Sequence, residues 1–307
     1  MKRVFILGVV TIFIVLNLGG HAFSIDIDEG FVSPQWLSEH LHDNDLRVVA
    51  VNFEQEDFEK EHIPGSVFVD WRSDLADTGE SRYYKIVSRS GFEKIMERIG
   101  VAEETAIIFY DNWNNRLSIR ALWVADLYGH HNTAILEGGI DAWKAAGFET
   151  NAHTTWYAPT RYRVDTTHQE IHADLAYIQS LIHDNDAFIV DGRPESMYTG
   201  MIRGTAVHTG EKIQRRGHIP GSVNIPWKDN INHEDRFLDR DTLMELYTSR
   251  GITGEKPTVF YCNEGVHAAY DWFVADRILG FKNVSVYDGS MVEWSDDPSL
   301  PLELGTE

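Results

Sequence analysis

The chain alternates between short apolar runs and longer amphipathic stretches. In its second half, the short runs predict buried strands at residues 187–190, 223–225, 257–261 and 284–287. Apolar residues at helical spacing predict helices at 173–183, 240–250 and 267–279, and Gly251 and Gly280 are the expected ends of the last two. Regular alternation of strands and helices predicts an α/β fold, in which a parallel sheet carries helices on both faces.

The two halves of the chain repeat one pattern. The phrase His-Ile-Pro-Gly-Ser-Val occupies residues 62–67 and again 218–223, and other shared segments precede and follow it in the same order. A duplicated domain accounts for this order better than chance does. We therefore predict a first domain over residues 23–150, a polar linker over 151–167 and a second domain over 168–307.

Residues 1–22 have the layout of a secretory signal peptide. Lys2 and Arg3 precede an apolar run that ends at Leu18, and Gly20 and Ala22 occupy the small-residue positions of a cleavage site. The run is about fifteen residues long, which is short for a membrane span of about 20. We expect cleavage after Ala22, a periplasmic or secreted protein, and no stable membrane association afterwards.

Composition narrows the classes of function. The 307 residues are enough for about two domains. The formal net charge is −21, from 27 Lys and Arg against 48 Asp and Glu, so nucleic acid is not an expected partner. The single cysteine excludes an internal disulfide and a multi-cysteine metal site. The 14 histidines show no metal-ligand spacing, and no metal site is predicted. His62 and His218 are expected to hold turns.

Cys262 is the candidate nucleophile. It follows the predicted strand 257–261 and opens the loop Cys-Asn-Glu-Gly-Val-His-Ala at residues 262–268. Ligands bind at the carboxyl ends of parallel strands, where loop N–H groups and a helix start are expected to lower a thiol pKa. The thiolate is the nucleophilic form, and Gly265 permits the dihedral angles of a tight loop. The alternative is an inert core cysteine.

The repeated phrases, the segment Asp191-Gly-Arg193 and the 262–268 loop resemble a tandem-domain sulfurtransferase of the rhodanese family. The resemblance covers nearly the whole mature chain. It implies that Cys262 takes sulfane sulfur from a donor such as thiosulfate or 3-mercaptopyruvate and holds it as a persulfide. A thiol or cyanide-like acceptor then removes the sulfur, with no cofactor. Asp111 stands near the corresponding place in the first domain, which is therefore expected to be catalytically silent.

The resemblance also implies a substrate-binding set, made of the rest of the loop and one arginine: Asn263, Glu264, Gly265, Val266, His267, Ala268 and Arg193. Arg193 is expected chiefly as an ion-pair partner near the loop, with substrate contact as the second option. His267 either tunes the thiolate or caps the following helix. Asp191 is expected to shape the loop rather than act as an acid.

The loop departs from the family pattern at Asn263 and Glu264. Thiosulfate-preferring members usually carry basic residues there, and mercaptopyruvate-preferring members carry Gly-Ser. Glu264 should repel a dianionic donor, although cations in the insertion before His218 could offset it, namely Arg203, Lys212, Arg215 and Arg216. The arginine of the mercaptopyruvate group is missing from the matching stretch at 196–198.

Two other functions compete with sulfur transfer. A phosphatase would need an arginine closing a longer loop to bind phosphoryl oxygens, and this loop ends at Ala268 instead. A non-catalytic binding or regulatory protein could keep the same fold. Capture of sulfur on Cys262 would separate that alternative from the enzyme.

Overall fold

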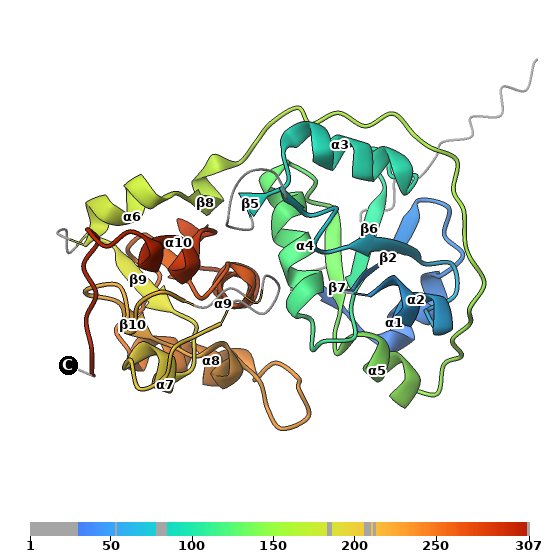
Figure 1. Cartoon of the computed structure of the whole chain (residues 1–307). Coiled ribbons are helices and arrows are strands. Elements are labelled where there is room, and N and C mark those ends of the chain that lie inside the picture. The colour runs from blue at the N-terminus through green and yellow to red at the C-terminus, as the bar shows by residue number, and fades with distance from the viewer. Residues whose placement is uncertain are drawn as a thin grey trace, which may run out of the picture.

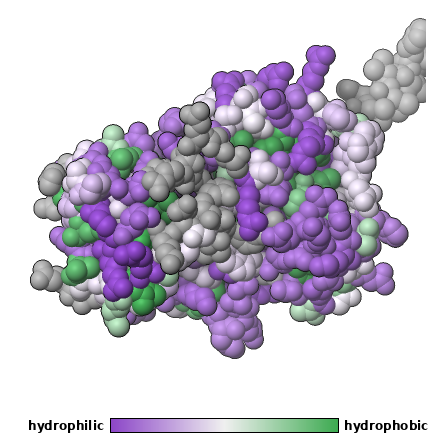
Figure 2. Space-filling view, viewed as in Figure 1, coloured by the Kyte–Doolittle hydropathy of each residue, from purple (hydrophilic) through white to green (hydrophobic). Residues whose placement is uncertain are grey.

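The computed structural model describes residues 30–52, 54–77, 85–182, 186–205, 210 and 213–305. They form two α/β domains that lie side by side (Figure 1). The predicted signal peptide lies outside the described residues. Hydrophilic side chains dominate the face shown in Figure 2, and hydrophobic ones form only small patches there.

The first domain is built on a five-stranded parallel sheet. Its strands, in spatial order, are β1 (Phe31–Val32), β7 (Thr133–Leu136), β6 (Ala106–Tyr110), β2 (Leu46–Asn52) and β3 (Val67–Asp70). One face packs against α1 (Pro34–His40), α2 (Gln55–Lys60) and α5 (Gly139–Ala145). The other packs against α3 (Arg89–Arg98) and α4 (Arg116–Leu127). A separate antiparallel pair, β4 (Ala76–Asp77) and β5 (Lys85–Ile86), contacts the second domain through the N–H of Ile86.

The second domain repeats this arrangement. Its parallel strands, in the matching order, are β8 (His172–Ala173), β12 (Val284–Tyr287), β11 (Thr258–Tyr261), β9 (Phe188–Asp191) and β10 (Val223–Asn224). Helices α6 (Leu175–Leu181) and α10 (Ser290–Asp296) cover one face. Helices α8 (Arg240–Ser249) and α9 (Val266–Phe273) cover the other, and the short α7 (Glu195–Tyr198) follows β9. The predicted parallel sheets with helices on both faces are confirmed.

Two predicted helices differ from the observed ones. The helix predicted to begin at Ala173 begins at Leu175, because Ala173 pairs with Tyr287 in the sheet. Asp174 caps that helix by accepting a 2.8 Å hydrogen bond from the N–H of Tyr177. The helix predicted over 267–279 is α-helical only to Phe273 and continues as the π-helical turn Val274–Ile278.

A single hydrophobic cluster runs through both domains. Successive strand residues point to opposite faces, so Val49 packs on the α4 side of the first sheet and Val48 on the α1 side. On the α4 side the cluster continues into the second domain, where α9 packs directly against α4. The loop that precedes α9 is therefore held by both domains.

Residues 151–167 connect the domains by running along the outside of the first one (Figure 1). Asn151 forms an isolated bridge with His62, and the Tyr157 hydroxyl donates to Gly65 O at 2.9 Å. Tyr162 and Val164 are buried against the first domain. The connection is thus packed along much of its length. None of the helices in the described part of the chain has the length and apolar character needed to cross a membrane.

Candidate active site

The repeated histidines hold the turns that precede β3 and β10. His62 Nδ1 donates to Phe58 O at 2.7 Å, and His218 Nδ1 donates to Tyr198 O at 2.8 Å. Each imidazole is buried and stacks on the ring of the same partner. Both histidines therefore hold turns, as the sequence predicts.

A tyrosine in each domain ties this turn to the central strand. The Tyr261 hydroxyl accepts a hydrogen bond from the N–H of Ile219 at 3.1 Å and bonds Ser222 Oγ at 3.0 Å. Tyr110 makes the same pair of contacts in the first domain. The residue after each tyrosine is the first residue of the loop at the carboxyl end of its strand. The hydrogen bonds from the His-Ile-Pro-Gly-Ser-Val segments to the tyrosines therefore fix the position at which each loop starts.

In the first domain, that loop encloses a carboxylate. Asp111 Oδ1 accepts from the N–H groups of Trp113 (2.8 Å) and Asn115 (2.9 Å). Its Oδ2 accepts from Leu117 and Ser118, both at 2.8 Å. Burial raises the pKa of Asp111, and these four N–H groups only partly oppose that rise. A strand–loop–helix crossing in this fold is therefore an anion cradle, and here the chain fills it with its own side chain.

In the second domain, Cys262 stands where Asp111 stands in the first. Its Sγ accepts a hydrogen bond from the N–H of Gly265 at 3.2 Å, and its own N–H donates to Ser290 Oγ at 3.1 Å. Gly265 has φ +85° and immediately precedes α9. The thiol is 1% exposed. The cradle that holds a carboxylate in the first domain thus holds sulfur in the second.

Burial raises the pKa of the Cys262 thiol above its ordinary value. The N–H groups of Glu264 and Ala268 lower the pKa, the charge of Glu264 raises it, and the N–H of Gly265 lowers it. The prediction that this loop lowers the thiol pKa is therefore wrong for the resting protein. Complete removal of the sulfur from water outweighs three backbone donors when a carboxylate lies beside them.

The other loop residues have distinct surroundings. Val266 and Ala268 are buried in the core, so their side chains face apolar neighbours. Glu264 is 6% exposed. Asn263 is also buried, and its amide donates to Thr205 O at 3.2 Å, which ties the loop to the insertion before His218. His267 is partly exposed, and its ring stacks on Trp227 at a centroid distance of 4.9 Å.

Arg193 is an ion-pair partner of Asp191. It is 1% exposed, its Nε and Nη2 donate to the Asp191 carboxylate, and Nη2 also donates to Gly217 O at 2.9 Å. Burial lowers the pKa of Arg193, but the Asp191 charge more than reverses this and the net direction is upward. The structure thus shows the ion pair and not an open substrate ligand. Asp191 shapes the turn by accepting from the Arg193 N–H at 2.9 Å.

Two of the insertion cations, Arg215 and Arg216, donate hydrogen bonds to backbone carbonyl oxygens in the described part of the chain. Arg215 is committed to four backbone carbonyl oxygens, those of Trp294, Ser295, Asp297 and Leu300. Arg216 donates to Met201 O at 3.4 Å, and Arg203 is exposed. Lys212 lies outside the described residues. That these cations offset Glu264 stays a prediction, and the Arg215 guanidinium also fastens the insertion to residues 294–300.

Sequence reasoning missed Arg120, which reaches the Cys262 loop from α4 of the first domain. Arg120 is 3% exposed and pairs with Asp288, which also accepts from the N–H of Ile86 at 2.9 Å. A Cβ on Gly265 would lie 3.1 Å from Arg120 Nη1. No local pattern could have indicated this contact, because it joins residues from different domains.

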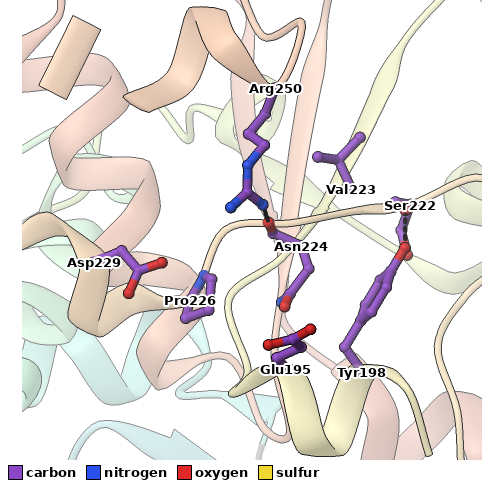
Figure 3. Close-up of a pocket in the computed structure, with 8 residues that line it drawn as sticks. All are labelled: Glu195, Tyr198, Ser222, Val223, Asn224, Pro226, Asp229 and Arg250. Atoms are coloured by element: carbon purple, nitrogen blue, oxygen red, sulfur yellow. Dashed lines mark hydrogen bonds between the residues drawn. The ribbon is translucent and has the colours of Figure 1, made fainter. Parts of the chain in front are cut away.

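Two cavities lie apart from the sulfur. One of about 340 Å³ borders β10, and Figure 3 shows Arg250, Asp229 and Glu195 at three different edges of it. Arg250 donates to Asn224 O. Another, of about 450 Å³, lies between the domains and is lined partly by Asp288. Within the described residues, no group of three or more His, Cys, Asp or Glu side chains could hold a metal ion.

Comparisons with known proteins agree with this architecture. A family model described as a rhodanese-like domain matches residues 33–146 and 174–297. The sulfur carrier protein TtuD of Thermus thermophilus is 32% identical over 282 residues, which cover 91% of this chain and 98% of that protein. A thiosulfate sulfurtransferase of Corynebacterium glutamicum is 33% identical over 281 residues, covering 90% and 91%.

Among solved structures, SseA from Escherichia coli, described as a 3-mercaptopyruvate sulfotransferase, superposes with a TM-score of 0.74 at 25% identity. The match covers 85% of this chain and 98% of that one. Both halves of the chain thus match one domain family, and these two relatives, which span about nine-tenths of the chain, are named as a sulfur carrier protein and a thiosulfate sulfurtransferase. The chain belongs to the rhodanese family and is a sulfurtransferase, with a sulfur donor and a sulfur acceptor as its substrates.

Proposed function

We propose that this protein is an exported sulfurtransferase that carries sulfane sulfur as a persulfide on Cys262. One observation carries the proposal: Cys262 occupies the backbone cradle in which Asp111 of the other domain sits as an anion acceptor. A carboxylate has no means of accepting sulfane sulfur. A thiolate in the same cradle is a nucleophile whose product, an anionic persulfide, meets the same N–H groups.

The chemistry with thiosulfate requires two displacements. Cys262 first loses its proton to water, and the thiolate attacks the outer sulfur of thiosulfate. A new S–S bond forms at Cys262 while the S–S bond of thiosulfate breaks, and sulfite leaves with the electron pair. An acceptor such as cyanide or a thiolate then attacks the outer sulfur of the persulfide, and Cys262 leaves as the thiolate. The N–H of Gly265, 3.2 Å from Sγ, supports the negative charge at both stages.

The sequence of residues 1–22 supports export. The segment has the features of a secretory signal peptide, namely a positively charged start, a short apolar run and small residues before the predicted cleavage site. Removal of this segment takes away two cations and leaves a mature net charge of −23.

Intact-mass spectrometry tests both parts of the proposal. The full chain is expressed in an exporting host, and the mature protein is mixed with thiosulfate or 3-mercaptopyruvate. The expected mass corresponds to a chain that begins at Phe23 and carries one added sulfur atom. Cys262→Ser should show no added sulfur and no transfer to cyanide, and Ser249→Ala, which removes an exposed hydroxyl at the end of α8, serves as the control.

The outcomes separate the alternatives. Full transfer activity in Cys262→Ser would overturn the persulfide mechanism. A persulfide that forms but is passed only to a protein acceptor would indicate a sulfur carrier. No adduct with any donor would favour a non-catalytic binding protein.

A further inference from the structure

Arg116 lies at the interface between the domains, and no ion pair joins it to a carboxylate among the residues that the structure describes. Its Nε donates to Trp113 O at 3.0 Å, while no hydrogen bond or ion pair within the described structure reaches its Nη atoms. Other arginines at this interface pair with carboxylates. Arg236 and Arg277, for example, pair across this interface with Glu137 and Asp126.

Two tryptophans hold the Arg116 guanidinium in place. Its central carbon lies 3.1 Å from the ring centroid of Trp113 and 4.9 Å from that of Trp227, which belongs to the second domain. Cation–π contacts of this kind fix the plane of a guanidinium and leave its edge free to donate hydrogen bonds. Burial lowers the pKa of Arg116 to about 10, opposed by the charges of Asp111, Tyr270 and Asp235, so it stays protonated at neutral pH.

The stack ends on the Cys262 loop. Trp227 stacks on His267 with an interplanar angle of 22°, and the Trp113 and His267 rings are 6.4 Å apart. His267 is a partly exposed member of the loop whose N–H groups surround the sulfur. Arg116 therefore borders the rim of the loop from the opposite domain.

We propose that Arg116 binds the anionic group of the sulfur donor, so that the silent domain supplies the positive charge that the Cys262 loop lacks. The loop itself carries Asn263 and Glu264 at the positions where a positively charged side chain would attract an anionic donor. A guanidinium with free Nη donors matches the oxygen atoms of a thiosulfate or a carboxylate. The ligand class is thus a small sulfane or mercapto acid that carries negative charge.

This inference rests on the proposed function, and its test uses donors of different charge. Thiosulfate is a dianion, whereas dimethyl trisulfide carries sulfane sulfur without charge. Arg116→Gln should raise the KM for thiosulfate about tenfold and leave transfer from dimethyl trisulfide unchanged. Arg116→Lys should stay within about threefold of the unmodified protein, because it keeps the charge.

Arg277→Gln is the matched control. Arg277 is also an arginine at the domain interface, but it is neutralised by Asp126, about 15 Å along α4 from Arg116. Calorimetric titration of thiosulfate into Cys262→Ser, with and without Arg116→Gln, measures the dissociation constant of thiosulfate in the absence of turnover. The unmodified protein gives an independent measurement, since raising KCl should raise the KM for thiosulfate and not that for dimethyl trisulfide.

Several results would overturn the inference. They are an unchanged KM in Arg116→Gln, an equal loss in Arg277→Gln, a Lys variant as weak as the Gln variant, or equal salt dependence for both donors. Failure of the inference leaves persulfide formation on Cys262 intact. Failure of the proposed function is instead the absence of a sulfur adduct with every donor.

Discussion

At the scale of single residues, the difference between the two domains is Cys262 against Asp111. Both side chains are 1% exposed, and both accept hydrogen bonds from backbone N–H groups at the end of a central strand. Burial raises the pKa of each group. Four backbone N–H groups donate hydrogen bonds to the Asp111 carboxylate, so the first loop is filled by its own side chain. The Cys262 loop must instead admit a sulfur donor for the thiol to react.

Burial is the main cause of the raised pKa of the Cys262 thiol, and the charge of Glu264 adds to it. At neutral pH the thiol is therefore protonated, and the thiolate appears as the pH rises. Glu264→Gln removes the charge and should shift the thiolate titration to lower pH, with a faster first displacement at pH 7. Ultraviolet absorbance of the single thiolate, measured against Cys262→Ser, follows this titration.

Glu255→Gln makes the same charge change at an exposed site and should leave the titration where it is. A Glu264→Gln profile that does not move, or moves to higher pH, would show that Glu264 does not govern the thiol.

At the scale of elements, the active loop depends on a conformation that only glycine adopts easily. Gly265 has φ +85° and joins β11 to α9 through the loop. A Cβ there would lie 2.7 Å from Asp288 Oδ1 and 3.1 Å from Arg120 Nη1. The N–H that bonds the sulfur therefore belongs to a residue pressed against a buried ion pair.

Gly265→Ala should reduce sulfur transfer strongly, because relieving the contact moves the N–H away from Sγ. Left-handed backbone alone costs a non-glycine residue about 1–2 kcal/mol. Gly251→Ala separates the two effects, since Gly251 has φ +84° with nothing within 4 Å of its Cβ position. Both variants should unfold at lower denaturant, and only Gly265→Ala should lose activity. Equal activity in the two variants would contradict this role for Gly265.

At the scale of the whole molecule, the silent domain is part of the site. Helices α4 and α9 share one hydrophobic cluster, and the Arg120–Asp288 pair joins the domains behind the Cys262 loop. Both side chains of that pair are 4% exposed. A buried ion pair that loses one partner leaves an uncompensated charge, and the penalty is far larger than at the surface.

Arg120→Gln should lower the free energy of unfolding by about 3–5 kcal/mol, because Asp288 stays buried without its partner. Arg98→Gln breaks the half-exposed pair with Asp74 and should cost about 0–1 kcal/mol. Denaturant titration measures both. If the two variants lost the same small amount of stability, the Arg120–Asp288 pair would not lock the domains together.

Much of the fold follows from local pattern. The strand predicted at 284–287 is β12, and the apolar runs before Asp111 and Cys262 are the central strands β6 and β11. Such runs are readable because a buried strand needs consecutive apolar residues on both faces of the sheet. Ala173 has the spacing of the following helix, and its place in the sheet does not follow from local pattern because its partner Tyr287 is far away in the chain.

The sequence by itself determined the duplicated α/β architecture, the place of Cys262 at a strand end and the lack of a thiol in the first copy, because repeats and strand–loop junctions are local features. Only the tertiary structure decided the direction of the thiol pKa, the contact of Arg116 with Trp227 and the contact of Arg120 with Asp288 and Gly265. Burial depends on how distant segments pack together, and the Arg116 and Arg120 contacts depend on which groups meet across the domain interface, and no local pattern of residues records either.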